Sequence, residues 1–190
     1  MTKKSINFIR KKLQSDEPSL GTWQQIPSSS ISEILGNAGY DWVAVDLEHG
    51  SFSNHQLPDF FRAIENADCI PLARISEPTA VNCKLALDAG AKGVIAPMIE
   101  TAEQVKLVVE SCCWPPSGKR GVGYSRANLF GRNFDSYLSE AQSPLIVIQI
   151  ESIKAVNNLN DILNVEGIDA VMVGPYDLSA TMGITGDFQN

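Results

Sequence analysis

Short apolar runs alternate with longer segments of helical character along most of the chain. The runs are nearly continuous in hydrophobic side chains, which is typical of strands buried on both faces of a parallel sheet. The predicted strands are Leu20–Gln24, Trp42–Asp46, Ile70–Arg74, Gly93–Pro97, Leu145–Ile150 and Ala170–Val173. The predicted helices between and after them are Ser29–Ala38, Asn54–Asn66, Thr79–Ala89, Ala102–Cys112, Phe134–Ala141 and Ile153–Leu163. This alternation predicts an α/β fold built from βα units.

Three helix-to-strand joints carry a glycine at a matching place, namely Gly39, Gly90 and Gly167. Glycine just past a helix supplies the left-handed turn that returns the chain to the sheet. The regularity favours a single (β/α) barrel domain over residues 1–190 rather than a doubly wound open sheet. A complete barrel has eight units and usually needs about 250 residues. With about six units here, we expect either a fragment or an incomplete barrel without its last two units, whose first and sixth strands have open edges.

Composition and charge narrow the class of protein. Hydrophobic residues make up 44% of the chain and charged residues 19%, which predicts a folded globular domain. The formal net charge of -7 leaves no basic surface for phosphates, so nucleic acid is not expected as a partner. No apolar stretch reaches about 18 residues and the N-terminus lacks the apolar core of a signal peptide, so we expect a cytoplasmic protein without a membrane partner. The four cysteines lack metal or disulfide spacing and are interpreted as buried thiols.

Polar residues interrupt the pattern at the ends of several predicted strands. In a parallel barrel, catalytic groups gather at the carboxyl ends of the strands, where the following loops converge on one mouth. The second, third, fifth and sixth strands are followed there by Asp46, Glu48, His49, Arg74, Gln149, Glu151 and Asp177. A fixed cation, an imidazole and several carboxylates are therefore expected on one rim.

Glu151 and Asp177 are the candidate metal ligands. Each has a plainer interpretation: Glu151 could complement the positive end of the helix dipole that follows it, and Asp177 could cap the helix that begins at Leu178. Taken together, two carboxylates from neighbouring strand ends suit a hard divalent ion such as Mg²⁺ or Mn²⁺.

His49, Asp46 and Arg74 are the candidate catalytic residues. The Asp46 carboxylate lies three residues before His49, close enough to orient its imidazole as a general base. His55 lies near a helix start and is expected to be exposed. Arg74 at the end of an apolar strand needs an anionic partner, either a substrate carboxylate or enolate, or a structural salt bridge.

The long segment from Trp114 to Asn133 is predicted to be a loop, and loops of this length are often functional. Its Gly118–Gly123 stretch resembles a phosphate-binding loop but lacks Walker A spacing and the strand and helix context of a dinucleotide site. A nucleotide site is therefore rejected. For Lys119, Arg120 and Arg126 two interpretations remain, a solvated mobile lid or direct substrate contact.

The residues now described resemble those of the HpcH/HpaI family of class II, metal-dependent pyruvate aldolases. That family includes 2,4-dihydroxyhept-2-ene-1,7-dioate and 2-dehydro-3-deoxyglucarate aldolases. The likeness runs from Leu20 to Ala180 and is strongest in Asp46–Gly50, Pro71–Arg74, Gly93–Met98, Arg120–Gly123, Gln149–Glu151 and Gly174–Ser179.

The resemblance implies a (β/α)₈ TIM barrel of the pyruvate/phosphoenolpyruvate type and a carbon–carbon lyase activity. The implied reaction is aldol cleavage or condensation of a 4-hydroxy-2-oxo acid, giving pyruvate and an aldehyde, with Mg²⁺, Mn²⁺ or Co²⁺ as cofactor. It further implies that the full-length protein is a homo-oligomer whose C-terminal extension packs against a neighbouring subunit. The matching positions assign catalysis to His49, Asp46 and Arg74, substrate binding to Gln149, Gly174, Tyr176 and Glu48, and metal binding to Glu151 and Asp177.

Other functions fit the same residues. A lyase acting on acyl-CoA substrates, or a decarboxylase, could use the same metal and enolate chemistry. A truncated chain could also be a non-catalytic remnant that still binds pyruvate. Tyr176 stands where the family usually has a small residue before the metal-binding aspartate, which could change the pocket.

Overall fold

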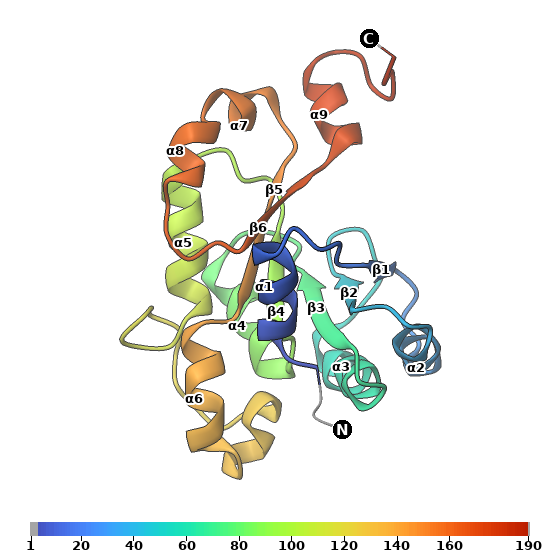
Figure 1. The fold of residues 1–190 in the computed structure, drawn as a ribbon, viewed down its shortest axis with the longest axis vertical. Helices are drawn as coiled ribbons and strands as arrows, with labels where there is room; N and C mark the ends of the chain where they lie inside the picture. Colours follow the sequence, from blue (N-terminus) through green and yellow to red (C-terminus); the bar gives the residue numbers. More distant parts are fainter. Residues whose placement is uncertain (1–3, 190) are drawn as a thin grey trace.

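The computed structural model describes residues 4–189, and its centre is a parallel β-sheet. Six strands lie side by side in sequence order (Figure 1). They are β1 (Gly21–Gln24), β2 (Trp42–Asp46), β3 (Ile70–Arg74), β4 (Gly93–Ala96), β5 (Leu145–Ile150) and β6 (Ala170–Val173). Each agrees with its predicted range to within one residue at either end. The α/β class and the parallel order are thus confirmed, with β1 and β6 at the edges of the sheet.

Helical segments follow each strand, and those after β1 to β5 cover the outer side of the sheet. They are α2 (Ser29–Asn37), α3 (Leu57–Asn66) preceded by the 3₁₀ turn η1 (Asn54–Gln56), α4 (Ala80–Ala89), α5 (Ala102–Cys112), η2 (Arg126–Gly131), α6 (Phe134–Gln142), α7 (Ile153–Asn157), α8 (Leu159–Leu163) and α9 (Pro175–Thr181). The predicted helix over 153–163 is broken at Asn158, which ends α7 and begins α8. Across residues 4–189, no helix is long and apolar enough to cross a lipid bilayer.

Local signals in the sequence explain several of these boundaries. Thr101 caps α5, with Gln104 completing a capping box. Gly39, Gly90 and Gly167 have φ angles of 95°, 112° and 100°, so the three helix-to-strand joints use the left-handed turns that glycine favours.

The sheet curls around a small apolar core on its inner side. Side chains from the middle strands meet there with Ile6 and Ile9 of α1 (Ile6–Gln14), a helix that the sequence analysis did not predict. Figure 1 shows α1 lying across this inner face of the sheet. Ala170 and Met172 of β6 also face this core, whereas the alternate residue Val173 points outward and is 59% exposed. The curled sheet with helices outside it is part of a (β/α) barrel, as expected.

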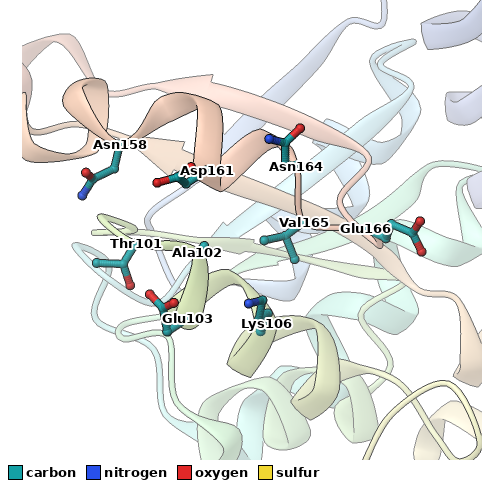
Figure 2. Close-up of a pocket in the computed structure, with 9 residues that line it drawn as sticks. All are labelled: Thr101, Ala102, Glu103, Lys106, Asn158, Asp161, Asn164, Val165 and Glu166. Carbon is teal, nitrogen blue, oxygen red and sulfur yellow. The ribbon is translucent and has the colours of Figure 1, made fainter.

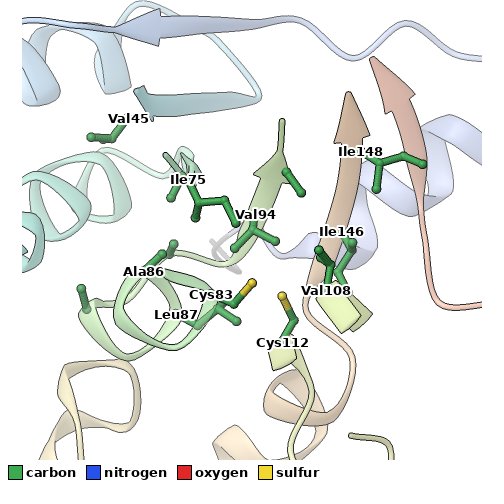
Figure 3. Close-up of a cluster of buried hydrophobic side chains, with 14 of the residues drawn as sticks. Val45, Ile75, Cys83, Ala86, Leu87, Val94, Val108, Cys112, Ile146 and Ile148 are labelled. Carbon is green, nitrogen blue, oxygen red and sulfur yellow. The ribbon is translucent and has the colours of Figure 1, made fainter. Parts of the chain in front are cut away.

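The larger core fills the space between the sheet and the outer helices α3, α4 and α5. Val94, Ile146 and Ile148 from the strands contact residues of these helices and are at most 1% exposed. Figure 3 shows Cys83 of α4 and Cys112 of α5 facing each other within this core. All four cysteines are buried free thiols, as the sequence predicted.

The long segment between α5 and β5 differs from its prediction. It connects a helix to the amino end of a strand, so it lies at the opposite end of the sheet from the carboxyl ends of the strands. Arg120 is 3% exposed, lies over the Trp114 ring and donates to the Tyr137 hydroxyl. Arg126 is 8% exposed and pairs with Glu65. Both interpretations, a solvated lid and a substrate contact, are therefore wrong for these two arginines, which fix the segment to the helical layer.

The contact between Arg126 and Glu65 belongs to a partly buried network of charges. Lys92 lies between Glu65 and Glu140, at 3.4 and 2.9 Å from their carboxylates. Burial raises the pKa of Glu65, but the charges of Lys92 and Arg126 outweigh it and hold that pKa below its ordinary value. Ionised Glu65 therefore stabilises the folded state above its ordinary pKa, and this contribution is lost as the pH falls through the lowered value.

We expect Glu65→Gln to lower the free energy of unfolding at pH 7 and to have progressively less effect as the pH falls below 4.5, the ordinary pKa of this carboxyl. The reason is that protonated glutamate is close to glutamine in charge and shape. Urea unfolding of both proteins between pH 7 and pH 3 measures the difference. An effect of Glu65→Gln that is as large at pH 3 as at pH 7 would contradict this assignment.

Candidate active site

The predicted site residues lie at the carboxyl ends of β2, β3, β5 and β6. Asp46 ends β2 and Arg74 ends β3, and the parallel register places the two residues directly opposite each other. Gln149 near the end of β5 and Glu151 just after it lie beside β6 and Gly174, the N-cap of α9. The rim expected from the sequence is therefore present.

Asp46 and Arg74 form a bidentate ion pair. Arg74 Nε lies 2.9 Å from Asp46 Oδ1, and Nη2 lies 2.6 Å from Oδ2. Asp46 is fully buried; burial raises its pKa, but the hydrogen bonds from Arg74 and Gln25 outweigh this and lower it. Burial lowers the pKa of the Arg74 guanidinium, but its hydrogen bonds to Asp46 outweigh burial and raise that pKa above its ordinary value. Both side chains thus stay ionised.

Two more groups hold the guanidinium in place. The Trp23 ring lies under it, with 4.6 Å between the ring centroid and Arg74 Cζ. Glu48 Oε2 lies 3.2 Å from Arg74 Nη1, and no hydrogen bond satisfies this buried oxygen within the described residues. Burial and the nearby Glu151 carboxylate raise the pKa of Glu48, whereas Arg74 opposes the shift. Arg74 is therefore a fixed cation with two carboxylates, Asp46 and Glu48, within ion-pair distance.

The predicted contact between Asp46 and the His49 imidazole is not formed. Asp46 Oδ1 instead accepts from the backbone N–H groups of Glu48 and His49, both at 3.2 Å. Over residues 4–189, no hydrogen bond joins the carboxylate to the imidazole ring, and the side chain of His49 is exposed. The tight turn after β2 and the two bonds from Arg74 use the carboxylate, so Asp46 orders the backbone of His49 rather than its ring. His55 is exposed, as expected.

Glu151 is a buried carboxylate with both oxygens engaged. It is 2% exposed, Oε1 accepts from the Met98 N–H at 2.5 Å, and Oε2 accepts from Gln149 Nε2 at 2.6 Å. Gly174 lies against it: a Cβ added to Gly174 would come within 2.5 Å of Glu151 Oε2 and 2.8 Å of its Cβ. Any larger residue at position 174 would displace this carboxylate. Gln149 Oε1 is buried and has no partner within the described part of the chain.

Asp177 and Tyr176 lie in the first turn of α9, where Gly174 is the N-cap. The plainer interpretation of Asp177 as a helix cap is therefore wrong by position. Its side chain is exposed, and Tyr176 is 65% exposed with its ring edge against Phe188. In residues 4–189, the hydrogen bonds and ion pairs do not link Asp177 to Glu151.

The oxygen atoms near Glu151 fit a hard divalent cation. Within the described ranges, no group of three His, Cys, Asp or Glu side chains is placed to hold a metal ion. Mg²⁺ is commonly held by one or two carboxylates, with water and substrate oxygens completing its shell. Glu48 Oε2 and Gln149 Oε1, which accept no hydrogen bond within the described residues, are further oxygens that could complete such a shell through water.

Two sizeable hollows of the surface lie away from the rim. A groove of about 560 Å³ runs between α5 and α8, lined by Glu103, Lys106, Asp161 and Glu166 among others (Figure 2). It contains none of the rim residues. Its mixed charges face solvent on the outer helical layer, so the chemistry of the rim and not the size of a hollow identifies the candidate site.

Three residues at the rim were missed in the sequence analysis. Trp23 lies in β1 and Gln25 directly follows it. They were missed because no charged residue marks the end of this predicted strand. Gln25 Nε2 donates to Asp46 Oδ2 at 2.8 Å. Met98 follows β4 and acts through its backbone, which leaves no signal in the residue type.

Comparison with known proteins gives a consistent result. The family model described as "HpcH/HpaI aldolase/citrate lyase" matches residues 20–189. The chain is 40% identical over 185 residues to a hydroxypyruvate/pyruvate aldolase of Roseobacter denitrificans, covering 95% of this chain and 72% of that protein. It is 39% identical over 180 residues to a 2-keto-3-deoxy-L-rhamnonate aldolase of Salmonella gallinarum, covering 93% of this chain and 67% of that protein.

A solved structure shows the same fold. The crystal structure of an HpcH/HpaI aldolase/citrate lyase family protein from Burkholderia cenocepacia superposes with a TM-score of 0.88 and 36% identity, covering 95% of this chain and 74% of that one. The relatives named as aldolases and this neighbour all contain the region in which the rim residues lie.

Proposed function

The chain belongs to the HpcH/HpaI aldolase/citrate lyase family, and on that basis we propose that it cleaves a 4-hydroxy-2-oxo acid into pyruvate and an aldehyde, and catalyses the reverse condensation. It is a carbon–carbon lyase, as its named relatives are. The observation that best supports the reaction is Arg74, a guanidinium fixed by Asp46 at the same end of the sheet as the buried Glu151 carboxylate.

Glu151 and Asp177 are the proposed ligands of a divalent metal, namely Mg²⁺, Mn²⁺ or Co²⁺. When bound, the metal acts as a Lewis acid toward the 2-oxo acid. Glu151 is already aligned by its two hydrogen bonds, whereas Asp177 is exposed on the first turn of α9. Buried Gln149 and the bare backbone at Gly174 would bind the pyruvate half of the substrate, with Tyr176 and Glu48 at its border.

Arg74 is proposed to stabilise the enolate that cleavage produces. As the C3–C4 bond breaks, negative charge develops on the pyruvate oxygen, and a preorganised cation lowers the energy of that charge without reorganising. Asp46 and Trp23 hold the guanidinium from two directions. In this proposal Asp46 acts through Arg74, which replaces the orienting role toward His49 expected from the sequence.

His49 is the proposed base that removes the proton from the C4 hydroxyl. Its backbone is fixed by Asp46, and its ring is exposed where an incoming substrate can reach it. We expect His49→Ala to lower aldol cleavage by about 100-fold or more, within the range that general bases contribute. Exchange of the pyruvate methyl protons should fall less, because that reaction needs no hydroxyl base.

The measurement couples released pyruvate to lactate dehydrogenase and follows methyl-proton exchange by NMR. His55→Ala is the matched control, since it removes the other exposed histidine away from the rim. Equal losses of cleavage and exchange in His49→Ala would rule out the assigned role.

The same coupled assay tests the function as a whole. Folded protein with Mn²⁺ or Mg²⁺ should release pyruvate from a 4-hydroxy-2-oxo acid. Cleavage of an acyl-CoA substrate instead would identify the alternative lyase, and loss of carbon dioxide from a 2-oxo acid would identify a decarboxylase. Binding of pyruvate with no turnover of any of these substrates would identify a non-catalytic binding protein.

Cytoplasmic location and assembly into a homo-oligomer are further parts of the proposal. They follow the expectation from the sequence. Cell fractionation and light scattering of the purified protein would test them.

A further inference from the structure

Met98 has an unusual backbone for its residue type. It follows Pro97 at the end of β4 with a φ angle of 55°, in the left-handed region that non-glycine residues seldom adopt. Its side chain is 48% exposed, so packing of the thioether in the core does not account for this conformation. Costly backbone conformations persist where the surroundings fix them, often at functional sites.

The consequence of this conformation is where the Met98 N–H points. This N–H, in the loop after β4, donates at 2.5 Å to Oε1 of Glu151, which follows the neighbouring strand β5. Gln149 Nε2 holds the other oxygen at 2.6 Å. A hydrogen bond to an ionised carboxylate is stronger than one between two neutral groups. The two bonds to Glu151 therefore hold its side chain in a single orientation.

The segment after Met98 is itself tied down. Gln104 of α5 accepts from the backbone N–H groups of Glu100 and Thr101, at 2.8 and 3.0 Å. The loop after β5 is bound to the same segment: Ser152 Oγ donates to Glu100 Oε1 at 2.9 Å, and Asn158 Nδ2 donates to the Glu100 carbonyl at 2.8 Å. The loops after β4 and β5 therefore form one hydrogen-bonded unit around Glu151.

We propose that Met98 is a positioning residue whose left-handed backbone, not its side chain, aims the Glu151 carboxylate at the metal. This inference rests on the proposed function, in which Glu151 is a metal ligand. Partners that orient a metal ligand typically change metal affinity by about 10-fold to 100-fold when they are lost.

Two substitutions separate backbone from side chain. Met98→Gly removes the thioether but adopts a positive φ readily and keeps the N–H. Met98→Ile keeps an apolar side chain of similar size, but a β-branched residue strongly disfavours this backbone. Leu129 offers a matched control, because it has a φ angle of 50° and is 47% exposed but lies in η2, far along the chain from the rim.

The experiment measures Mn²⁺ binding by electron paramagnetic resonance, together with urea unfolding. Met98→Ile should weaken Mn²⁺ binding by about 10-fold or more, whereas Met98→Gly should bind Mn²⁺ like the wild-type chain. Leu129→Ile should lower stability as Met98→Ile does and leave Mn²⁺ binding unchanged. Equal weakening in Met98→Gly and Met98→Ile, or no weakening in either, would overturn the proposal.

A second readout needs neither metal nor an altered Met98. The Met98 amide proton of the wild-type chain should resonate far downfield and exchange slowly, and Glu151→Gln should move it upfield. An ordinary Met98 amide signal that Glu151→Gln does not move would overturn the hydrogen bond on which the proposal stands. If the downfield signal is present but the wild-type chain binds no Mn²⁺, the proposed metal-dependent function is wrong. The proposal for Met98 is then wrong too, although the hydrogen bond to Glu151 is present.

Discussion

Replacing Glu151 with glutamine is expected to abolish metal-dependent aldol cleavage and to weaken Mn²⁺ binding by about 100-fold or more, the upper end of what ligand perturbations cost. The reason is that glutamine lacks the carboxylate charge that holds a divalent ion. Each Glu151 oxygen now accepts from an N–H, one from Met98 and one from Gln149. The new amide keeps the bond from the Met98 N–H with its oxygen, and its NH₂ group then faces Gln149, whose own amide must turn to accept with Oε1.

The measurements are Mn²⁺ binding and pyruvate release, with urea unfolding to show that the variant folds. Glu103→Gln is a suitable control, because it removes one exposed carboxylate from the groove between α5 and α8 rather than from the rim. Asp177→Ala should also lose metal-dependent activity. Retained Mn²⁺ affinity and turnover in the Glu151 variant would show that the metal binds elsewhere.

Replacing Arg74 with alanine is expected to lower turnover by about 100-fold or more, the usual effect of losing one partner of a developing oxyanion. Mn²⁺ binding should change little, because Arg74 is not a ligand. Stability should fall by about 3–5 kcal/mol, since the change leaves Asp46 buried without its counter-ion. Arg74→Lys should recover part of the stability and little of the turnover, because an ammonium cannot reproduce the bidentate contact.

A double variant separates the two effects. Adding Asp46→Asn to Arg74→Ala removes the unpaired charge, so stability should return toward that of the wild-type protein while turnover stays low. Urea unfolding and the coupled pyruvate assay measure the two quantities on the same samples. Wild-type turnover in Arg74→Ala would refute its role toward the enolate.

The order and bounds of the strands were predictable because strands buried on both faces of a parallel sheet consist almost entirely of hydrophobic residues. β4 and β5 are buried at every position, and their apolar runs stand out in the sequence. Helix α1 was not predicted because its short amphipathic pattern has only Ile6 and Ile9 on the buried face. The break at Asn158 was also missed, since a residue that ends one helix and begins another leaves the apolar spacing nearly unchanged.

The rim was predictable for a similar reason, since charges stand out at the ends of apolar strands. Which groups contact each other was not. Asp46 was expected to bind the His49 imidazole from their spacing of three residues, but Arg74 on the neighbouring strand takes the carboxylate. Spacing along the chain reports only local neighbours, whereas register across the sheet decides this contact. The contact from the Met98 N–H to Glu151 could not be predicted either, because the residue type does not determine which way a backbone N–H points.

The ion pair between Asp46 and Arg74 also constrains how this protein can evolve. Asp46 is fully buried, so a change in either residue alone leaves a charge without its partner in the interior. A lineage that replaces Arg74 with a different group for stabilising the enolate must pass through such a destabilised intermediate or alter both positions together. The pair therefore acts as a barrier to gradual drift, and new substrate preferences would arise more readily at exposed positions around the rim, such as Tyr176.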